Sequence, residues 1–140
     1  ERPLSPEEKA RKELWYRVSS ALEKTLSRFE QDVEPQKIVI GIANRSKDMF
    51  LHIKSIKFQH HRLPDEALLP SYHKSDASYI AIPFDESAAN LAPGDDFSVE
   101  LELQQKWELS HIERLKGELG FLVLDVVYNR ELVEGILIQV

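Results

Sequence analysis

The chain contains no cysteine, and its 140 residues include only five glycines and one methionine. Without cysteine, disulfides, thiolate metal ligands and a cysteine nucleophile are all excluded. No run of about 18 apolar residues is present, so the sequence predicts no membrane-spanning helix. The glycines are not clustered, and the short motifs of phosphate-binding loops, zinc proteases and serine hydrolases are missing. These absences weaken an enzymatic interpretation, although a catalytic site built from scattered residues would leave no such motif.

Charge is distributed unevenly along the chain, which has a formal net charge of −6. Residues 35–74 carry seven Lys or Arg against three Asp or Glu, whereas residues 85–118 carry three against nine. An acidic chain lacks the excess of cations that neutralises phosphates, so we expect no general nucleic-acid binding. The basic segment is still compatible with a small pocket for one anion.

The strongest strand pattern lies in the last 22 residues. Two apolar runs, 121–128 and 132–140, flank a short polar break that begins at Asn129. This pattern predicts two antiparallel strands joined by a tight turn in which Asn129 is left-handed. Because residues 121–128 are apolar on both alternating faces, we expect a central strand that is covered on both sides.

The N-terminal part of the chain predicts one amphipathic helix. Ser5 followed by Pro6 and two acids is typical of a helix start. Apolar residues then recur at three- and four-residue steps: Leu14, Val18, Leu22, Leu26, Phe29 and Val33. We expect a helix of about 25 residues that ends before Pro35. Its apolar face either packs on a sheet or forms a stalk or a self-associating coil.

Four further strands are predicted before the C-terminal pair, over residues 37–43, 49–61, 77–84 and 97–104. The second of them changes its apolar phase near Lys54 and Ser55, which predicts a bulge. A long loop is expected over residues 62–76, which contain two prolines. After residue 104 the pattern is ambiguous, and we favour a strand through Leu109 followed by a short helical turn.

Strands separated by turn signals, with no second long helix between them, predict a mainly β fold. We expect an antiparallel, immunoglobulin-like β-sandwich of about six to eight strands behind one long N-terminal helix. A small β-barrel is the alternative. The chain then divides into the helix, residues 1–34, and the sandwich domain, residues 35–140.

A basic patch is the candidate ligand-binding site, and its residues are Lys54, Lys57, His61, Arg62 and Tyr72. Cations beside an aromatic ring would suit a small anion such as a nucleotide. The alternative explanation is an edge strand that lysines protect from pairing with other chains.

No catalytic, metal or cofactor site is predicted. Four histidines, His52, His60, His61 and His73, lie close together in the sequence. Their spacing matches no pattern of metal ligands. Glu100 and Glu102 share one face of a strictly alternating strand, which indicates exposure rather than a catalytic pair of carboxylates.

These patterns favour a non-catalytic interaction or accessory domain. The chain starts with Glu1 rather than Met, and the helix starts within six residues of it. We therefore expect a soluble domain that an upstream segment tethers to a membrane. Its partner would be another protein, or a second copy bound through the N-terminal helix. A small-anion or nucleotide sensor is the second hypothesis, and a hydrolase is the third.

Overall fold

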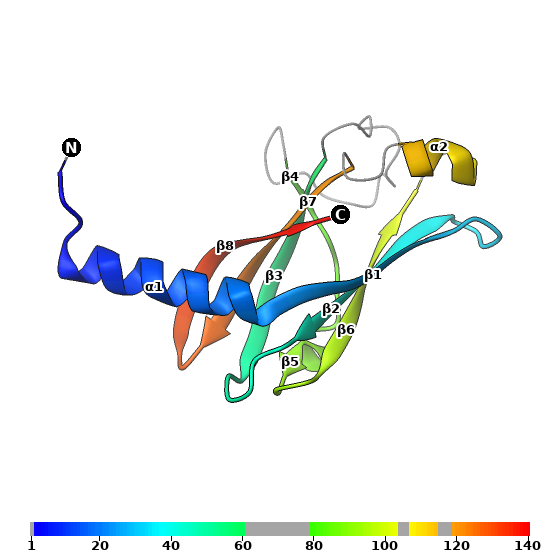
Figure 1. Ribbon diagram of the computed structural model, residues 1–140. Coiled ribbons are helices and arrows are strands. Elements are labelled where there is room, and N and C mark those ends of the chain that lie inside the picture. The colour runs from blue at the N-terminus through cyan, green and yellow to red at the C-terminus, as the bar shows by residue number, and fades with distance from the viewer. Residues whose placement is uncertain (1, 61–78, 104–106, 115–118) are drawn as a thin grey trace.

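A computed structural model describes residues 2–60, 79–103, 107–114 and 119–140 of the protein. An N-terminal helix leads directly into the first of the eight strands that these ranges contain (Figure 1). The elements are α1 (Pro6–Ala21), β1 (Leu22–Glu30), β2 (Lys37–Asn44), β3 (Leu51–His60), β4 (Tyr79–Ala81), the 3₁₀ helix η2 (Glu86–Ala88), β5 (Asn90–Leu91), β6 (Asp96–Glu102), α2 (Leu109–Arg114), β7 (Gly120–Tyr128) and β8 (Glu131–Gln139). None of the helices in the described ranges has both the length and the apolar composition of a bilayer span.

Two antiparallel sheets share one apolar core. The first has the strand order β1-β2-β6, and the second has the order β4-β3-β7-β8, with β5 beside the start of β3. Core side chains come from both sheets and include Ile38, Ile40, Ile42, Val99, Leu101, Ile53, Phe58, Leu122, Leu124, Val126 and Ile136. The predicted mainly β, antiparallel fold behind an N-terminal helix is therefore confirmed. In the described residues no strand pairing joins the two sheets, so they do not close into a barrel.

The start of α1 is as predicted, but its length is not. Ser5 caps the helix, and its Oγ accepts a hydrogen bond from the Glu8 backbone N–H at 3.2 Å. The helix ends at Ala21, and β1 then pairs antiparallel with β2. The prediction of one helix of about 25 residues is therefore wrong, and self-association through the helix stays a prediction.

The reason for the shorter helix lies in β2, in which residues 38–44 are all buried. A buried strand needs hydrogen-bonding neighbours on both edges, and β1 and β6 provide them. A helix over residues 22–30 would leave one edge of β2 unpaired. β1 and β2 therefore lie in the same sheet, although residue 34 between them is the predicted boundary of the two units. The division into units 1–34 and 35–140 stays a prediction.

The C-terminal hairpin is confirmed. Asn129 and Arg130 have φ angles of 51° and 65° and form the two-residue turn between β7 and β8. Positive φ at both central residues is what a tight hairpin of this twist requires. β7 is central, as predicted, with β3 and β8 as its neighbours. Its second face is half-buried at Val123, Asp125 and Val127, so the expected cover is complete on one side and partial on the other.

Both neighbours of β7 bulge opposite Asp125. The register of β3 shifts between Ile53 and Ser55, which confirms the predicted bulge, and β8 shifts where Gly135 takes a φ of 76°. The Asp125 carboxylate accepts hydrogen bonds from Ser55 Oγ at 2.8 Å and from the Gly135 N–H at 3.2 Å. One carboxylate therefore holds both irregular strands to the central one.

Two predicted strand limits differ from the structure. β4 covers only Tyr79–Ala81 within the described residues, and Leu109 begins α2 rather than ending a strand. The Trp107 N–H donates to Gln36 Oε1 at 2.7 Å, and its carbonyl accepts from Gln36 Nε2 at 3.0 Å. Because the Gln36 side chain takes the place of a strand partner here, the backbone has left the sheet before Leu109.

Candidate functional site

The two residues of the predicted basic patch that the structure describes each have a partner of their own. Lys54 Nζ lies 3.6 Å from a Glu86 carboxylate oxygen, and Lys57 Nζ lies 5.9 Å from the centre of the Tyr79 ring. His61, Arg62 and Tyr72 lie outside the described residues. Lys54 and Lys57 alone therefore give no anion site, and the patch as a whole stays a prediction.

Of the four clustered histidines, His52 is the one whose side chain the structure describes. Its Nδ1 lies 2.8 Å from Asn90 Oδ1, and its Nε2 lies 4.0 Å from a Glu86 carboxylate oxygen. Across the part of the chain that the structure describes, no three His, Cys, Asp or Glu residues come together as a metal site would require.

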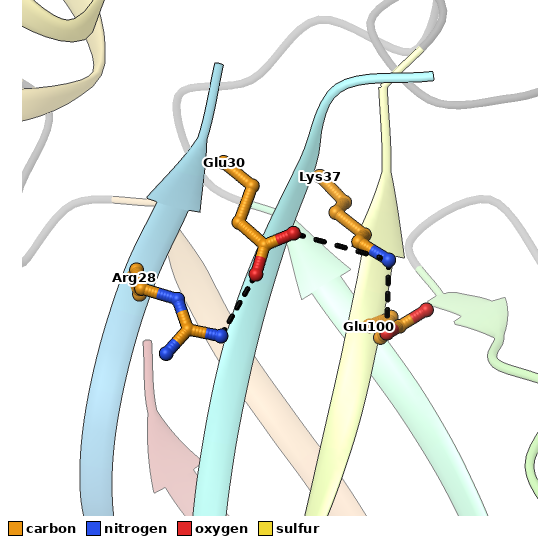
Figure 2. A network of polar contacts seen from close by, with 4 residues as sticks. All are labelled: Arg28, Glu30, Lys37 and Glu100. Atoms are coloured by element: carbon orange, nitrogen blue, oxygen red, sulfur yellow. Dashed lines mark hydrogen bonds and ion pairs between the residues drawn. The ribbon is translucent and has the colours of Figure 1, made fainter. Parts of the chain in front are cut away.

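A network of charges covers the outer face of the first sheet (Figure 2). Lys37 Nζ lies 3.1 Å from Glu100 and 3.9 Å from Glu30, which in turn pairs with Arg28 at 2.8 Å. The hydrogen bond to Glu100 raises the pKa of the Lys37 ammonium. Glu100 is exposed, as predicted, and Glu102 is half-buried. The network is that of a solvated sheet face rather than of a catalytic pair.

A hollow of about 450 Å³ lies between the last turns of α1 and the loop from β2 to β3. Two arginines line it, but Asp48 lines it too, and Arg45 Nε pairs with Glu23 at 3.0 Å. The C-terminal end of a helix also carries partial negative charge, which disfavours an anion here. Arg17 lies over the Tyr128 ring, with its guanidinium carbon 5.7 Å from the ring centre.

The loop beside this hollow is shaped by Asn44, which is fully buried. Its Nδ2 donates to the carbonyls of Met49 at 2.8 Å and Leu91 at 3.0 Å. Its Oδ1 accepts from the Ser46 N–H at 3.0 Å and from the Ser46 hydroxyl at 2.6 Å. Every hydrogen-bonding atom of the Asn44 side chain is thus engaged, and its role is to hold the loop against β5.

A groove of about 550 Å³ lies between α1 and the start of β8. We call it the α1–β8 groove, and its lining residues are Arg11, Leu14, Trp15, Glu131, Leu132, Val133 and Glu134. Leu14, Trp15 and the two β8 aliphatic residues provide apolar surface. Two acids on β8 and one base on α1 provide charge. An apolar surface bordered by unlike charges can bind another chain, but it offers no nucleophile with an adjacent base.

One face of α1 forms the helix side of this groove. Leu14, Trp15 and Val18 pack against the core, and Trp15 Nε1 donates to the Gly135 carbonyl at 3.2 Å. Residues three and four apart share a helix face, so the same face continues toward the N-terminus through Arg11. Figure 1 shows the first turns of α1 extending past the β7–β8 hairpin. Between residues 6 and 13, every side chain except that of Glu8 is exposed.

The segment before α1 is tied to the helix. Arg2 pairs with Glu8 at 3.0 Å, and this contact, with the hydrogen bonds from Ser5, holds the pKa of the Glu8 carboxyl below its usual value. Leu4 lies between these anchors, and its side chain is 39 % exposed. An apolar residue is therefore displayed at the projecting end of the molecule.

The sequence did not identify the α1–β8 groove. Its two sides lie more than 100 residues apart, and only the packing of α1 on β8 brings them together. Two local features of the sequence pointed to the groove. Trp15 lies next to the apolar stripe of the helix, and Glu131 and Glu134 flank Leu132 and Val133 within an apolar run.

Comparison of the chain with protein-family models, with curated proteins and with solved structures found no match.

Proposed function

We propose that this protein is a non-catalytic interaction domain that binds another protein chain in the α1–β8 groove. The observation that carries the proposal is the exposed apolar surface there: the Leu132 side chain is 53 % exposed and lies beside Leu14 and Trp15. Contact surfaces between proteins typically combine such an apolar centre, often with an aromatic residue, and a charged rim.

The position of the groove on the molecule also supports an interaction role. It lies where the exposed turns of α1 leave the hairpin, so a partner can contact both the groove and the projecting helix (Figure 1). A helix that is exposed around most of its circumference gains little from the core of its own domain. A bound partner would bury part of that surface.

A site-specific photo-crosslinker at position 132 tests the proposal in the cells that express the full gene product. We expect a covalent adduct with a defined protein chain. The matched control carries the crosslinker at the exposed position Ser98 on β6, away from the groove. The absence of an adduct at position 132, or the same adducts at both positions, would contradict the proposal. Specific turnover of a small substrate by the purified domain would contradict its non-catalytic part.

Tethering to a membrane stays a prediction. Reading the residues that precede Glu1 in the gene product tests it directly. A run of about 20 apolar residues would support a tether, and a globular sequence there would contradict it.

A further inference from the structure

We propose that the chain bound in the α1–β8 groove is a second copy of this protein, whose α1 packs antiparallel to the first. Each copy would insert its Leu4 beside Leu14 of the other. Because this inference names the occupant of the groove, it rests on the proposed function. The symmetry would be a two-fold axis, which makes both contacts identical.

The geometry of α1 allows the apolar contact of Leu4 with Leu14 and the ion pair of Glu7 with Arg11 to form in the same dimer. In an antiparallel pair, the register that places Glu7 opposite Arg11 is centred on residue 9. It also brings Leu4, which precedes the Ser5 cap, to the part of the other helix that carries Leu14. Glu7, Arg11 and Leu14 lie on one face of α1, given about 3.6 residues per turn, and Leu4 lies in the segment just before the Ser5 cap. Lys9 lies roughly 200° around the helix from Arg11 and points away from the contact.

The charges on α1 are complementary to themselves in this orientation. The acids Glu7 and Glu8 lie in the first turn, and Arg11 follows one turn later. An antiparallel arrangement brings the acidic turn of each copy to the Arg11 of the other, whereas a parallel arrangement brings like charges together. The two helix dipoles are also opposed, which adds a small favourable contribution.

The rim of the groove matches the segment that would enter it. Glu131 and Glu134 give the β8 side two negative charges. The entering segment carries Arg2 close to Leu4, and Arg2 is 74 % exposed in its pair with Glu8. A cation would therefore meet the acidic rim while Leu4 contacts the apolar surface, which is the division of roles that is common in protein interfaces.

Sedimentation equilibrium of the purified chain is the first measurement. The helical part of the contact, residues 6–14, spans about 12 Å of axis, so the interface is small, and we expect a dimer dissociation constant of roughly 10 to 100 µM. A chain that stays monomeric up to about 1 mM would overturn the inference.

Two charge reversals then test the register. Arg11→Glu places an acid opposite Glu7 and Glu8 of the other copy, and Glu7→Lys places a base opposite Arg11. Each variant alone should dimerise about tenfold more weakly than the native chain, or worse. An equimolar mixture of the two should recover most of the lost affinity, because both pairs between residues 7 and 11 are again of opposite sign.

The matched control is Lys9→Glu, which makes the same change of charge on the same helix but on its far side. It should leave dimerisation unchanged. Misfolded variants would not regain dimerisation when mixed, so recovery of affinity excludes a loss of folding. Circular dichroism of each variant verifies the fold. Equal weakening by Lys9→Glu, or no rescue on mixing, would overturn the inference. A monomeric chain whose position 132 still crosslinks to a different protein in cells would overturn this inference and leave the proposed function standing.

Discussion

β1 and β2 are neighbours in one sheet, yet they differ in almost every other respect. Residues 38–44 of β2 are all buried, whereas residues 23–28 of β1 are all exposed. The apolar pattern of β2 predicts a strand by itself, but that of β1 resembles a helix. The comparison shows that β1 is a strand because β2 needs a partner, so its conformation is determined by a neighbour rather than by its own sequence.

The largest expected difference in stability is between substitutions at two paired residues, one on β2 and one on β1. Ile40 is fully buried and lies opposite Ser27 in the ladder. Ile40→Ala should lower the free energy of unfolding by about 3–4 kcal/mol, because it removes core contacts and leaves a cavity. Ser27→Ala should change it by less than about 0.5 kcal/mol. Urea unfolding measures both, and similar losses would contradict the difference in burial.

The end of β2 should be almost as sensitive, for a polar reason. Asn44→Ala leaves the carbonyls of Met49 and Leu91 without their amide donor, and we expect a loss of about 2–4 kcal/mol. The control is Asn90→Ala on β5, where the residue is exposed and its Oδ1 lies 2.8 Å from His52 Nδ1. Thermal unfolding should show a clearly smaller shift for the control, and equal shifts would argue against a structural role for Asn44.

A third change tests how tightly β1 is held to β2. A Cβ added at Gly41 would lie 2.5 Å from Thr25 Oγ1 and 3.0 Å from Leu26 Cγ, both on β1. Gly41→Ala should therefore displace β1 and cost about 1–3 kcal/mol. Hydrogen exchange should accelerate in β1 more than in β2. Adding Thr25→Ala removes the closest atom and should recover part of the loss, so strict additivity in the double-mutant cycle would contradict this contact.

The smallest effect concerns Lys37 on β2, which pairs with Glu100 on β6 and lies 3.9 Å from Glu30 on β1. The pKa of Lys37 is raised by its bond to Glu100, so the stabilisation is fully present below the unfolded-state pKa of lysine. It is lost as pH rises through the higher folded-state pKa. The difference in melting temperature between the native chain and Lys37→Gln should therefore shrink above about pH 10.4. High salt at neutral pH should shrink it as well, and a difference independent of both would contradict the ion pair.

Local features of the fold could be predicted from the sequence. The Ser5 cap, the turn at Asn129 and the bulge near Lys54 each depend on a few consecutive residues, and all are found. The length of α1 could not be predicted in this way, because Leu22 and Phe29 fit both a helical stripe and the inner face of a strand. The end of the strand before Leu109 depends on Gln36, which is remote in the sequence.

The candidate site was harder to predict than the fold. Lys54 and Lys57 looked like the start of a basic patch, but Glu86 and Tyr79 come close to them only after folding. The α1–β8 groove requires Trp15 to reach Gly135, a contact that no local pattern encodes. Charged and apolar residues are visible in the sequence, but folding decides which of them come into contact.

The junction between α1 and β1 has a mechanical consequence. Leu22 already has extended backbone angles, with φ −97° and ψ 128°, and the Arg45 N–H donates to the Ala21 carbonyl at 2.6 Å. Helix and strand therefore meet without a flexible hinge between them. A torque on the projecting end of α1 would be transmitted along the helix into β1, and then through the β1–β2 hydrogen bonds to β2. A force applied to the projecting end of the helix would therefore strain the first sheet.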